Sequence, residues 1–170
     1  MLICLDVDYR DPGAIAAGLL FERWSSPAAA REIVAPIPGV EPYVPGSFFR
    51  RELPCLLAVL GQVPGGVGAL EAILIDGYVW LDDAGRKGLG AHLFEHLGER
   101  VPVVGVAKTS FAGTAAIPVL RGTSKKPLWI TAAGLDPAAA ALQVAAMHGP
   151  HRLPTLLQRV DHLCRHAGDD

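Results

Sequence analysis

The chain has 170 residues, of which 51% are hydrophobic and 19% are charged, and its formal net charge is −2. This composition excludes a disordered chain and a coiled coil, and the length suits one domain with a sizeable core. Because the chain is weakly acidic, any contact with nucleic acid must come from local patches and not from a basic surface. We therefore expect a single domain over residues 1–170.

The three cysteines are odd in number and far apart, which favours free thiols over a disulfide framework. The longest uncharged run, residues 53–70, contains two prolines and four glycines and is too interrupted to span a membrane. The N-terminus reaches Asp6 without a basic region, so no signal peptide is indicated. We expect a cytoplasmic protein that does not contact the membrane.

The first half of the chain changes from short strands to a helix. Three apolar runs separated by turn-forming residues predict three strands in a meander, at residues 2–9, 14–24 and 31–35. Four prolines between residues 36 and 45 predict an extended segment, because proline does not fit a helix interior. From Ser47, a candidate N-cap, apolar residues then recur at helical spacing as far as Leu60.

The second half alternates strands and helices. Continuous apolar runs predict buried strands at residues 71–80, 101–107 and 128–131. Periodic segments predict helices at residues 89–97, 137–147 and 155–166, with Asp136 as the N-cap of the second. Residues 110–126 are expected to form a loop. This order of elements predicts an α/β fold, a mixed β-sheet with helices packed on its faces.

Three acidic residues stand in apolar surroundings. Asp6 lies within the first predicted strand, Asp76 ends a later one, and Glu52 falls within the first helical pattern. Carboxylates from separate elements that meet at one point suit Mg²⁺ or Mn²⁺, which activates water beside a phosphate. A purely structural role for these acids remains open, because aspartate at a strand end commonly forms a turn and glutamate in a helix is commonly solvated.

Several motifs follow one another along most of the chain. They are Leu-Asp-Val-Asp-Tyr at 5–9, Pro-Tyr-Val-Pro-Gly at 42–46, Arg-Glu-Leu-Pro at 51–54, Asp-Gly at 76–77, Gly-Val-Ala-Lys at 105–108, Arg-Leu-Pro at 152–154 and Asp-His at 161–162. In this order they resemble the endonuclease V family of metal-dependent nucleases, which act at deaminated purines. The resemblance implies a ribonuclease H-like fold, in agreement with the predicted elements.

The resemblance also implies catalytic roles. Asp6, Glu52 and Asp76 match the metal-binding acids of the family, which implies Mg²⁺ as cofactor with Mn²⁺ as a substitute. His162 matches its C-terminal catalytic histidine, and Lys108 matches a lysine near the scissile phosphate. From the residue pattern alone, a solvated histidine on a helix surface is the default interpretation of His162.

Substrate-binding residues follow from the same resemblance. Tyr43 matches the aromatic wedge that fills the space left by an everted base, and the backbone around Gly46 and Gly77 would line the pocket for that base. A base must leave the stack before its edge can be recognised, and glycine lets the backbone approach it closely. The residue pattern alone also allows Tyr43 to be an aromatic that caps the core.

Three stretches depart from the family pattern. Tyr78 follows the Asp-Gly pair where the family has histidine, and the Asp82–Asp83 pair stands where the family has positive or neutral residues. These changes alter the expected floor of the base pocket. One extra residue precedes His162, so His151 and His166 are alternatives to it.

We therefore expect a Mg²⁺-dependent endodeoxyribonuclease of DNA repair that acts on nucleic acid as a monomer. It would recognise an everted inosine and hydrolyse a phosphodiester on its 3′ side. One alternative is a relative that binds nucleic acid but is catalytically impaired. Another is an inosine-specific ribonuclease, because the sequence does not show how a 2′-hydroxyl would be received.

Overall fold

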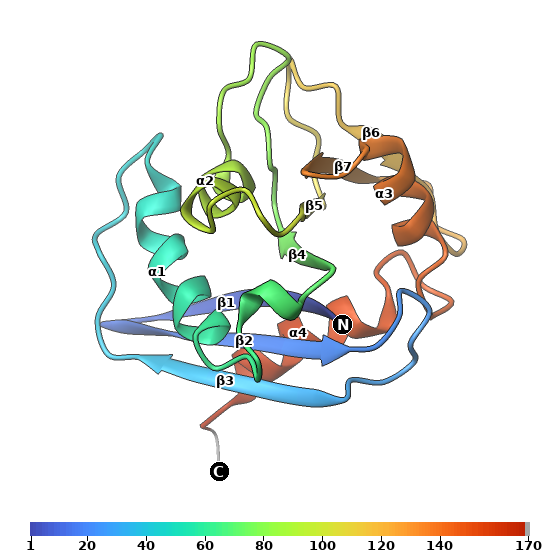
Figure 1. Cartoon of the computed structure of the whole chain (residues 1–170). Helices are drawn as coiled ribbons and strands as arrows, with labels where there is room; N and C mark the ends of the chain where they lie inside the picture. The colour runs from blue at the N-terminus through green and yellow to red at the C-terminus, as the bar shows by residue number, and fades with distance from the viewer. Residues whose placement is uncertain (169–170) are drawn as a thin grey trace.

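The protein is described by a computed structural model over residues 1–168, which form one seven-stranded sheet and four α-helices (Figure 1). The strands are β1 (Leu2–Arg10), β2 (Gly13–Phe21), β3 (Arg31–Ile37), β4 (Ala72–Asp76), β5 (Val103–Ala107), β6 (Ile117–Val119) and β7 (Leu128–Ala133). The helices are α1 (Phe48–Leu60), α2 (Leu89–His96), α3 (Pro137–Ala145) and α4 (Thr155–His166), with a 3₁₀ turn at Val67–Ala69.

The sheet is mixed, in the order β3-β2-β1-β4-β5-β7-β6. β1, β2 and β3 pair antiparallel as the predicted meander, whereas β4 and β5 run parallel to β1. Parallel strands end at the same edge of a sheet, so side chains at the C-terminal ends of β4 and β5 lie beside the middle of β1. This end of the sheet carries the acidic residues described below, and we call it the sheet edge.

Helices cover both faces of the sheet, because the side chains of a strand alternate between faces. Along β1, Ile3 and Leu5 pack with α1 and α2, whereas Leu2 and Cys4 pack with α3 and α4. The same alternation directs Asp6 to the α4 face. Two hydrophobic cores, one on each side of the sheet, therefore meet at β1.

The predicted mixed sheet flanked by helices is confirmed, and α4 has the predicted bounds. β4 ends at Asp76 and not at residue 80, because Gly77 has a φ of +127° and turns the chain out of the sheet. The predicted loop at 110–126 contains β6, a three-residue strand that pairs with β7 and is the outermost strand on that side of the sheet. A run this short carries no detectable alternation.

Helix ends and thiols follow the sequence in most respects. The carboxylate of Asp136 accepts a hydrogen bond from the Ala139 amide at 3.0 Å, as an N-cap does. Ser47 occupies the predicted N-cap position of α1, but its side chain makes no capping hydrogen bond. The three cysteines are free and buried. Within the described residues, no helix has the length and apolarity needed to cross a membrane. The expected domain runs to residue 170, and its last two residues lie outside the described ones.

Candidate active site

Two of the predicted acids are neighbours in the sheet. β1 pairs with β4 in a register that sets Leu5 opposite Ile75, so the next step along both strands places Asp6 beside Asp76. Neighbouring strands lie about 4.8 Å apart, which brings these carboxylates to one point at the sheet edge. Lys108, just after β5, joins them with its Nζ 2.7 Å from Asp76 Oδ2. A small cavity between this edge and α4 is lined by all three residues.

Glu52 approaches the same edge from α1. Its side chain is buried, with 7% of its surface exposed, and the Tyr9 hydroxyl lies 3.5 Å from Oε2. The guanidinium of Arg51 lies over the Tyr9 ring, 3.8 Å from the ring centroid. Since Tyr9 is on β1 and packs on the α1 face, it connects the glutamate to the strand that carries Asp6.

The three carboxylates share one electrostatic field. Burial raises the pKa of Asp6 to about 7, and the charge of Asp76 contributes. Burial also raises the pKa of Glu52 to about 8, with further contributions from the charges of Asp6 and Asp76. The cation of Lys108 opposes this effect at Asp6 but does not cancel it. The structure therefore groups Asp6, Asp76 and Lys108 around one cavity and sets Glu52 within the field of the two aspartates.

The residues present fit a hard divalent cation in their chemistry. Carboxylate oxygens are the ligands that Mg²⁺ and Mn²⁺ prefer, and the raised pKa values of Asp6 and Glu52 mark charge that a cation would offset. Within residues 1–168, no three His, Cys, Asp or Glu side chains already converge closely enough to hold a metal ion. A cation at this edge would therefore have to draw the carboxylates inward.

The C-terminal helix contributes an acid that the sequence prediction missed. The charge of Asp161, on α4, helps to raise the pKa of Asp6 and that of Lys108. Helical spacing could have indicated Asp161. Leu156, Val160 and Cys164 are buried, and Asp161 borders the helix face that they define. Its neighbour in sequence, His162, is exposed.

The ring of His162 contacts that of His166, with 4.2 Å between the centroids. Its predicted catalytic role stays a prediction, as do the alternatives His151 and His166. All three side chains are exposed.

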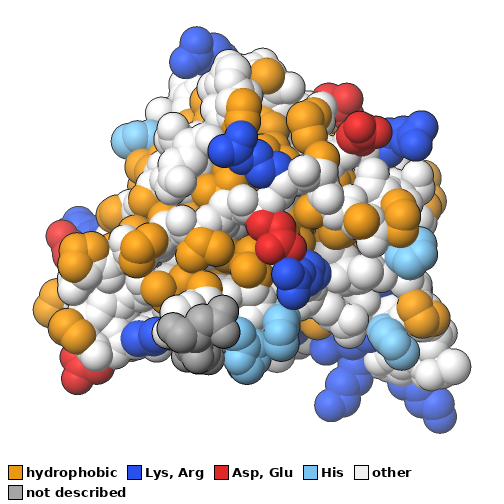
Figure 2. All heavy atoms as spheres, turned by 90° about the horizontal axis from the view of Figure 1, so that it is seen from below, with side chains coloured by type: hydrophobic (Ala, Val, Ile, Leu, Met, Phe, Trp, Pro, Cys, Tyr) orange, Lys and Arg blue, Asp and Glu red, His pale blue; other side chains and the backbone are white. Residues whose placement is uncertain are grey.

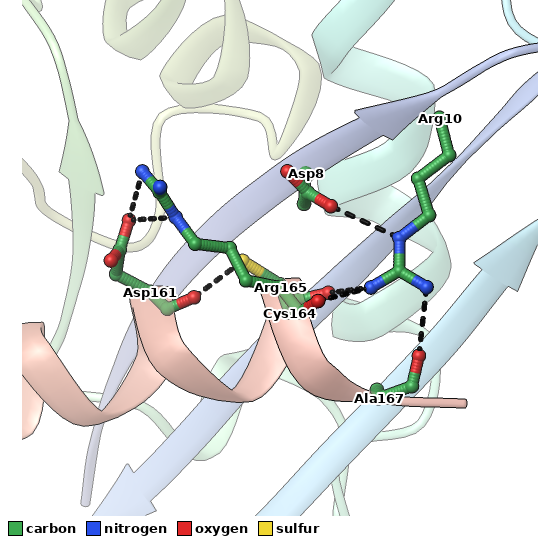
Figure 3. Close-up of polar contacts among 6 residues, drawn as sticks. All are labelled: Asp8, Arg10, Asp161, Cys164, Arg165 and Ala167. Atoms are coloured by element: carbon green, nitrogen blue, oxygen red, sulfur yellow. Dashed lines mark hydrogen bonds and ion pairs between the residues drawn. The ribbon is translucent and has the colours of Figure 1, made fainter. Parts of the chain in front are cut away.

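Arg10 fastens the end of α4 to β1 (Figure 3). Its guanidinium donates to the carbonyl oxygens of Cys164 and Ala167, both at 3.1 Å, and to that of Arg165. Its Nε donates to the Asp8 carboxylate at 3.0 Å. A cation at the carbonyl end of a helix is favourable both as a donor and through the helix dipole. This contact holds α4 against the strand that carries Asp6.

A second pocket, which we call the base pocket, adjoins the acids. It has a volume of about 250 Å³, and its lining includes Gly46, Phe48, Asp76, Gly77 and Tyr78. Gly46 and Gly77 both have a positive φ, and an added Cβ at either would meet nothing within 4 Å. The structure thus brings together the two glycines that the sequence placed in one pocket.

Tyr43 stands outside this lining, at the surface. Its side chain is 59% exposed, which contradicts the alternative that it caps the core. Its ring meets Phe48 edge-on, with 6.5 Å between centroids, and Phe48 lines the base pocket. The tyrosine is therefore next to the pocket and accessible from solvent.

Comparisons of sequence and of fold both find endonuclease V proteins. The family model described as Endonuclease V matches residues 1–154. Endonuclease V of Streptomyces avermitilis is 31% identical over 96% of this chain and 78% of the relative. Endonuclease V of Thermus thermophilus is 34% identical over 69% of this chain, which spans 50% of that relative.

Solved structures give the same result. The crystal structure of endonuclease V from S. avermitilis has a TM-score of 0.74 at 28% identity, covering 98% of this chain and 80% of that one. Human endonuclease V has a TM-score of 0.74 at 22% identity, covering 96% and 82%. Endonuclease V of Ciona intestinalis, in complex with DNA containing an inosine, has a TM-score of 0.76 at 16% identity, covering 96% and 83%. The predicted ribonuclease H-like fold is confirmed.

Proposed function

Because the chain belongs to the endonuclease V family, we propose that it is a metal-dependent endonuclease that recognises an everted inosine in DNA and hydrolyses a phosphodiester on its 3′ side. The position of Asp76 is the observation that carries this proposal. Asp76 lines both the cavity shared with Asp6 and Lys108 and the base pocket that contains Gly77. A nucleotide whose base lies in this pocket would therefore place its sugar-phosphate backbone beside the acids.

Asp6 and Asp76 would hold the metal ion, and Glu52 would complete its ligands or orient a water molecule. When bound, Mg²⁺, or Mn²⁺ in its place, would activate water and offset charge on the phosphate. Lys108 would place its ammonium at a phosphate oxygen, where charge develops during hydrolysis. Its contact with Asp76 supports this role, because it keeps the ammonium at the acidic edge.

Proton transfer is assigned to α4. His162 is the residue indicated by the family resemblance, and Asp161 is a second candidate on the same helix. The contribution of the Asp161 charge to the raised pKa of Asp6 supports Asp161 as this candidate.

Tyr43 would act as the wedge that replaces the everted base. An inserted aromatic ring offsets part of the stacking that the duplex loses. The exposure of Tyr43 and its contact with Phe48, which lines the base pocket, support this assignment. Gly46 and Gly77 would let the backbone reach the edge of the base.

Asp6→Ala and Asp76→Ala test the proposed activity. Each should lower Mg²⁺-dependent nicking of an inosine-containing DNA strand by on the order of 100-fold or more, because each removes a ligand of the cation. Circular dichroism and thermal melting should show that both variants fold. Wild-type nicking that persists in EDTA would contradict the metal role.

The same assay separates the alternatives. Tight binding of inosine DNA without a nick in Mg²⁺ or Mn²⁺ would favour the catalytically impaired relative. Faster nicking of inosine in RNA would favour the ribonuclease. A larger loss of activity in Asp161→Asn than in His162→Ala would assign the proton-transfer position to the aspartate, and the reverse order would assign it to the histidine.

A further inference from the structure

The base pocket has a cation in its wall. Among its described lining residues, Lys87 is the one that carries a basic side chain. The sequence around it, Gly-Arg-Lys-Gly at 85–88, reads as a turn that leads into α2, and none of the roles above uses it. Asp76 also lines this pocket, but the ion pair of Lys87 is with Glu95, and no metal or phosphate role has been assigned to the lysine.

The backbone of Lys87 is held in place. It forms an antiparallel bridge with Trp80, and the loop between them is closed by two hydrogen bonds of 2.8 Å. In these, the amide of Leu81 donates to the Arg86 carbonyl and the amide of Gly88 donates to the Val79 carbonyl. The base of the side chain therefore has a defined position at the pocket.

The ammonium group is oriented by α2. Lys87 Nζ lies 2.6 Å from a carboxylate oxygen of Glu95, and the two side chains are 41% and 42% exposed. An ammonium has three N–H donors, and one carboxylate oxygen takes one of them. Glu95 thus holds the ammonium of a residue that lines the pocket, and two of its N–H donors remain for another partner.

Apart from the carboxylate of Asp76, the rest of the lining suits a flat ring. Phe48 and Phe49 give aromatic surface, and Phe49 stacks on His92 with 3.6 Å between centroids and 14° between the planes. Burial and the charge of Lys87 lower the pKa of His92, which favours its neutral form. At about 250 Å³, the pocket is smaller than the roughly 300–1,000 Å³ of drug-sized sites. A single planar heterocycle fits such a space.

We propose that Lys87 is a specificity-determining residue, whose ammonium donates a hydrogen bond to an oxo group of the everted base. This inference rests on the proposed function and names the chemistry by which its pocket would select a base. Hypoxanthine has one oxo group, whereas xanthine has two and readily loses a ring proton to become an anion. Adenine has an amino donor at the same edge, which would face the ammonium donor to donor. The expected order of binding is xanthine, then hypoxanthine, then adenine.

Binding of single-site oligonucleotides tests this order. Fluorescence anisotropy would be measured in EDTA, without nicking, on duplexes that differ only in carrying xanthine, hypoxanthine or adenine at one position. Lys87→Met should lower the ratio of xanthine to adenine affinity about tenfold or more, since a hydrogen bond to a charged group is lost. Lys87→Arg should keep most of the ratio, because it retains a cationic donor.

Arg100→Met is the matched control. It removes the same charge from the loop before β5, at the opposite edge of the sheet from Asp76, and should leave the ratio unchanged. An equal loss of affinity for all three duplexes in Lys87→Met would assign the lysine to the phosphate backbone and overturn the inference. Wild-type protein that binds hypoxanthine and adenine equally would instead contradict base recognition in the proposed function.

Discussion

At the scale of single residues, environment separates the acids of this chain into different classes. Asp82 accepts a hydrogen bond from the Arg86 amide within a surface turn, which is the ordinary structural use of aspartate. Asp6 and Glu52 have raised pKa values because of burial, with a contribution from the charge of Asp76, so ionising either carboxyl costs free energy. Carboxyl groups with raised pKa values are concentrated at functional sites.

This cost predicts how stability depends on pH in the absence of metal. The folded-state pKa of Asp6, about 7, is above its ordinary 3.8, so the folded protein binds this proton more tightly than the unfolded chain does. The contribution of protonated Asp6 to the free energy of unfolding is complete below about pH 4 and is lost as the pH rises to about 7. Glu52 extends the same trend to about pH 8.

Asp6→Asn removes the titrating group. In EDTA, the melting temperature of the wild-type protein should fall between pH 5 and pH 8, and that of Asp6→Asn should fall less. The variant should melt roughly 5 °C above wild type at pH 8. Differential scanning fluorimetry measures this, with Asp83→Asn, at an exposed acid, as a control that should follow wild type. Parallel profiles of Asp6→Asn and wild type would show that ionisation of Asp6 does not destabilise the folded protein.

At the scale of elements, the placement of α4 decides whether its residues can reach the sheet edge. The helix packs on β1 and β2, and Arg10 holds its C-terminal carbonyl groups (Figure 3). One turn earlier, Asp161 accepts a hydrogen bond from Arg165, and its charge contributes to the raised pKa of Asp6. The position of Asp161 therefore depends on a contact one turn further along the same helix.

Arg10→Met should loosen this end of α4. Loss of the charged hydrogen bonds should cost about 2 kcal/mol and lower the melting temperature by roughly 4–8 °C. Amide hydrogen exchange should become faster in residues 155–166 but not in α1, because the fault is local. Arg10→Lys should fall between the two proteins, since lysine keeps the charge but not the fork of donors. Exchange that increases equally in α1 would refute a local role.

At the scale of the whole molecule, the net charge of −2 limits how the protein meets a polyanion. On the face drawn in Figure 2, Lys and Arg side chains form separate groups with hydrophobic and acidic side chains between them. A surface of this kind can make a few phosphate contacts and not a continuous row of them. Most of the selectivity would then have to come from the base pocket and the wedge.

We accordingly expect weak, salt-sensitive binding to duplex DNA. Between 50 and 200 mM salt, affinity for an inosine-containing duplex should fall roughly 10–100-fold, as about two to four phosphate contacts require. Anisotropy titrations over this range measure the slope. A binding curve that does not change with salt would mean that phosphate contacts contribute little.

The sequence by itself determined most of the elements and which acids lie in or at the end of them. Apolar periodicity predicted the meander, the alternation of strands and helices, and α4 to the residue, because each pattern reports which face of a local element is buried. The apolar surroundings of Asp6 and Asp76, together with the motifs, predicted that these acids belong to one candidate site. These signals are all contained within short stretches of chain.

Only the tertiary structure decided which distant side chains meet. That Asp161 acts on Asp6, that Arg10 holds the end of α4, and that Lys87 enters the wall of the base pocket all depend on strand register and helix docking. β6 likewise exists through its pairing with β7 and not through a pattern of its own. The physical reason is that periodicity gives the orientation of a side chain about its own element, whereas contact between elements depends on how their surfaces pack.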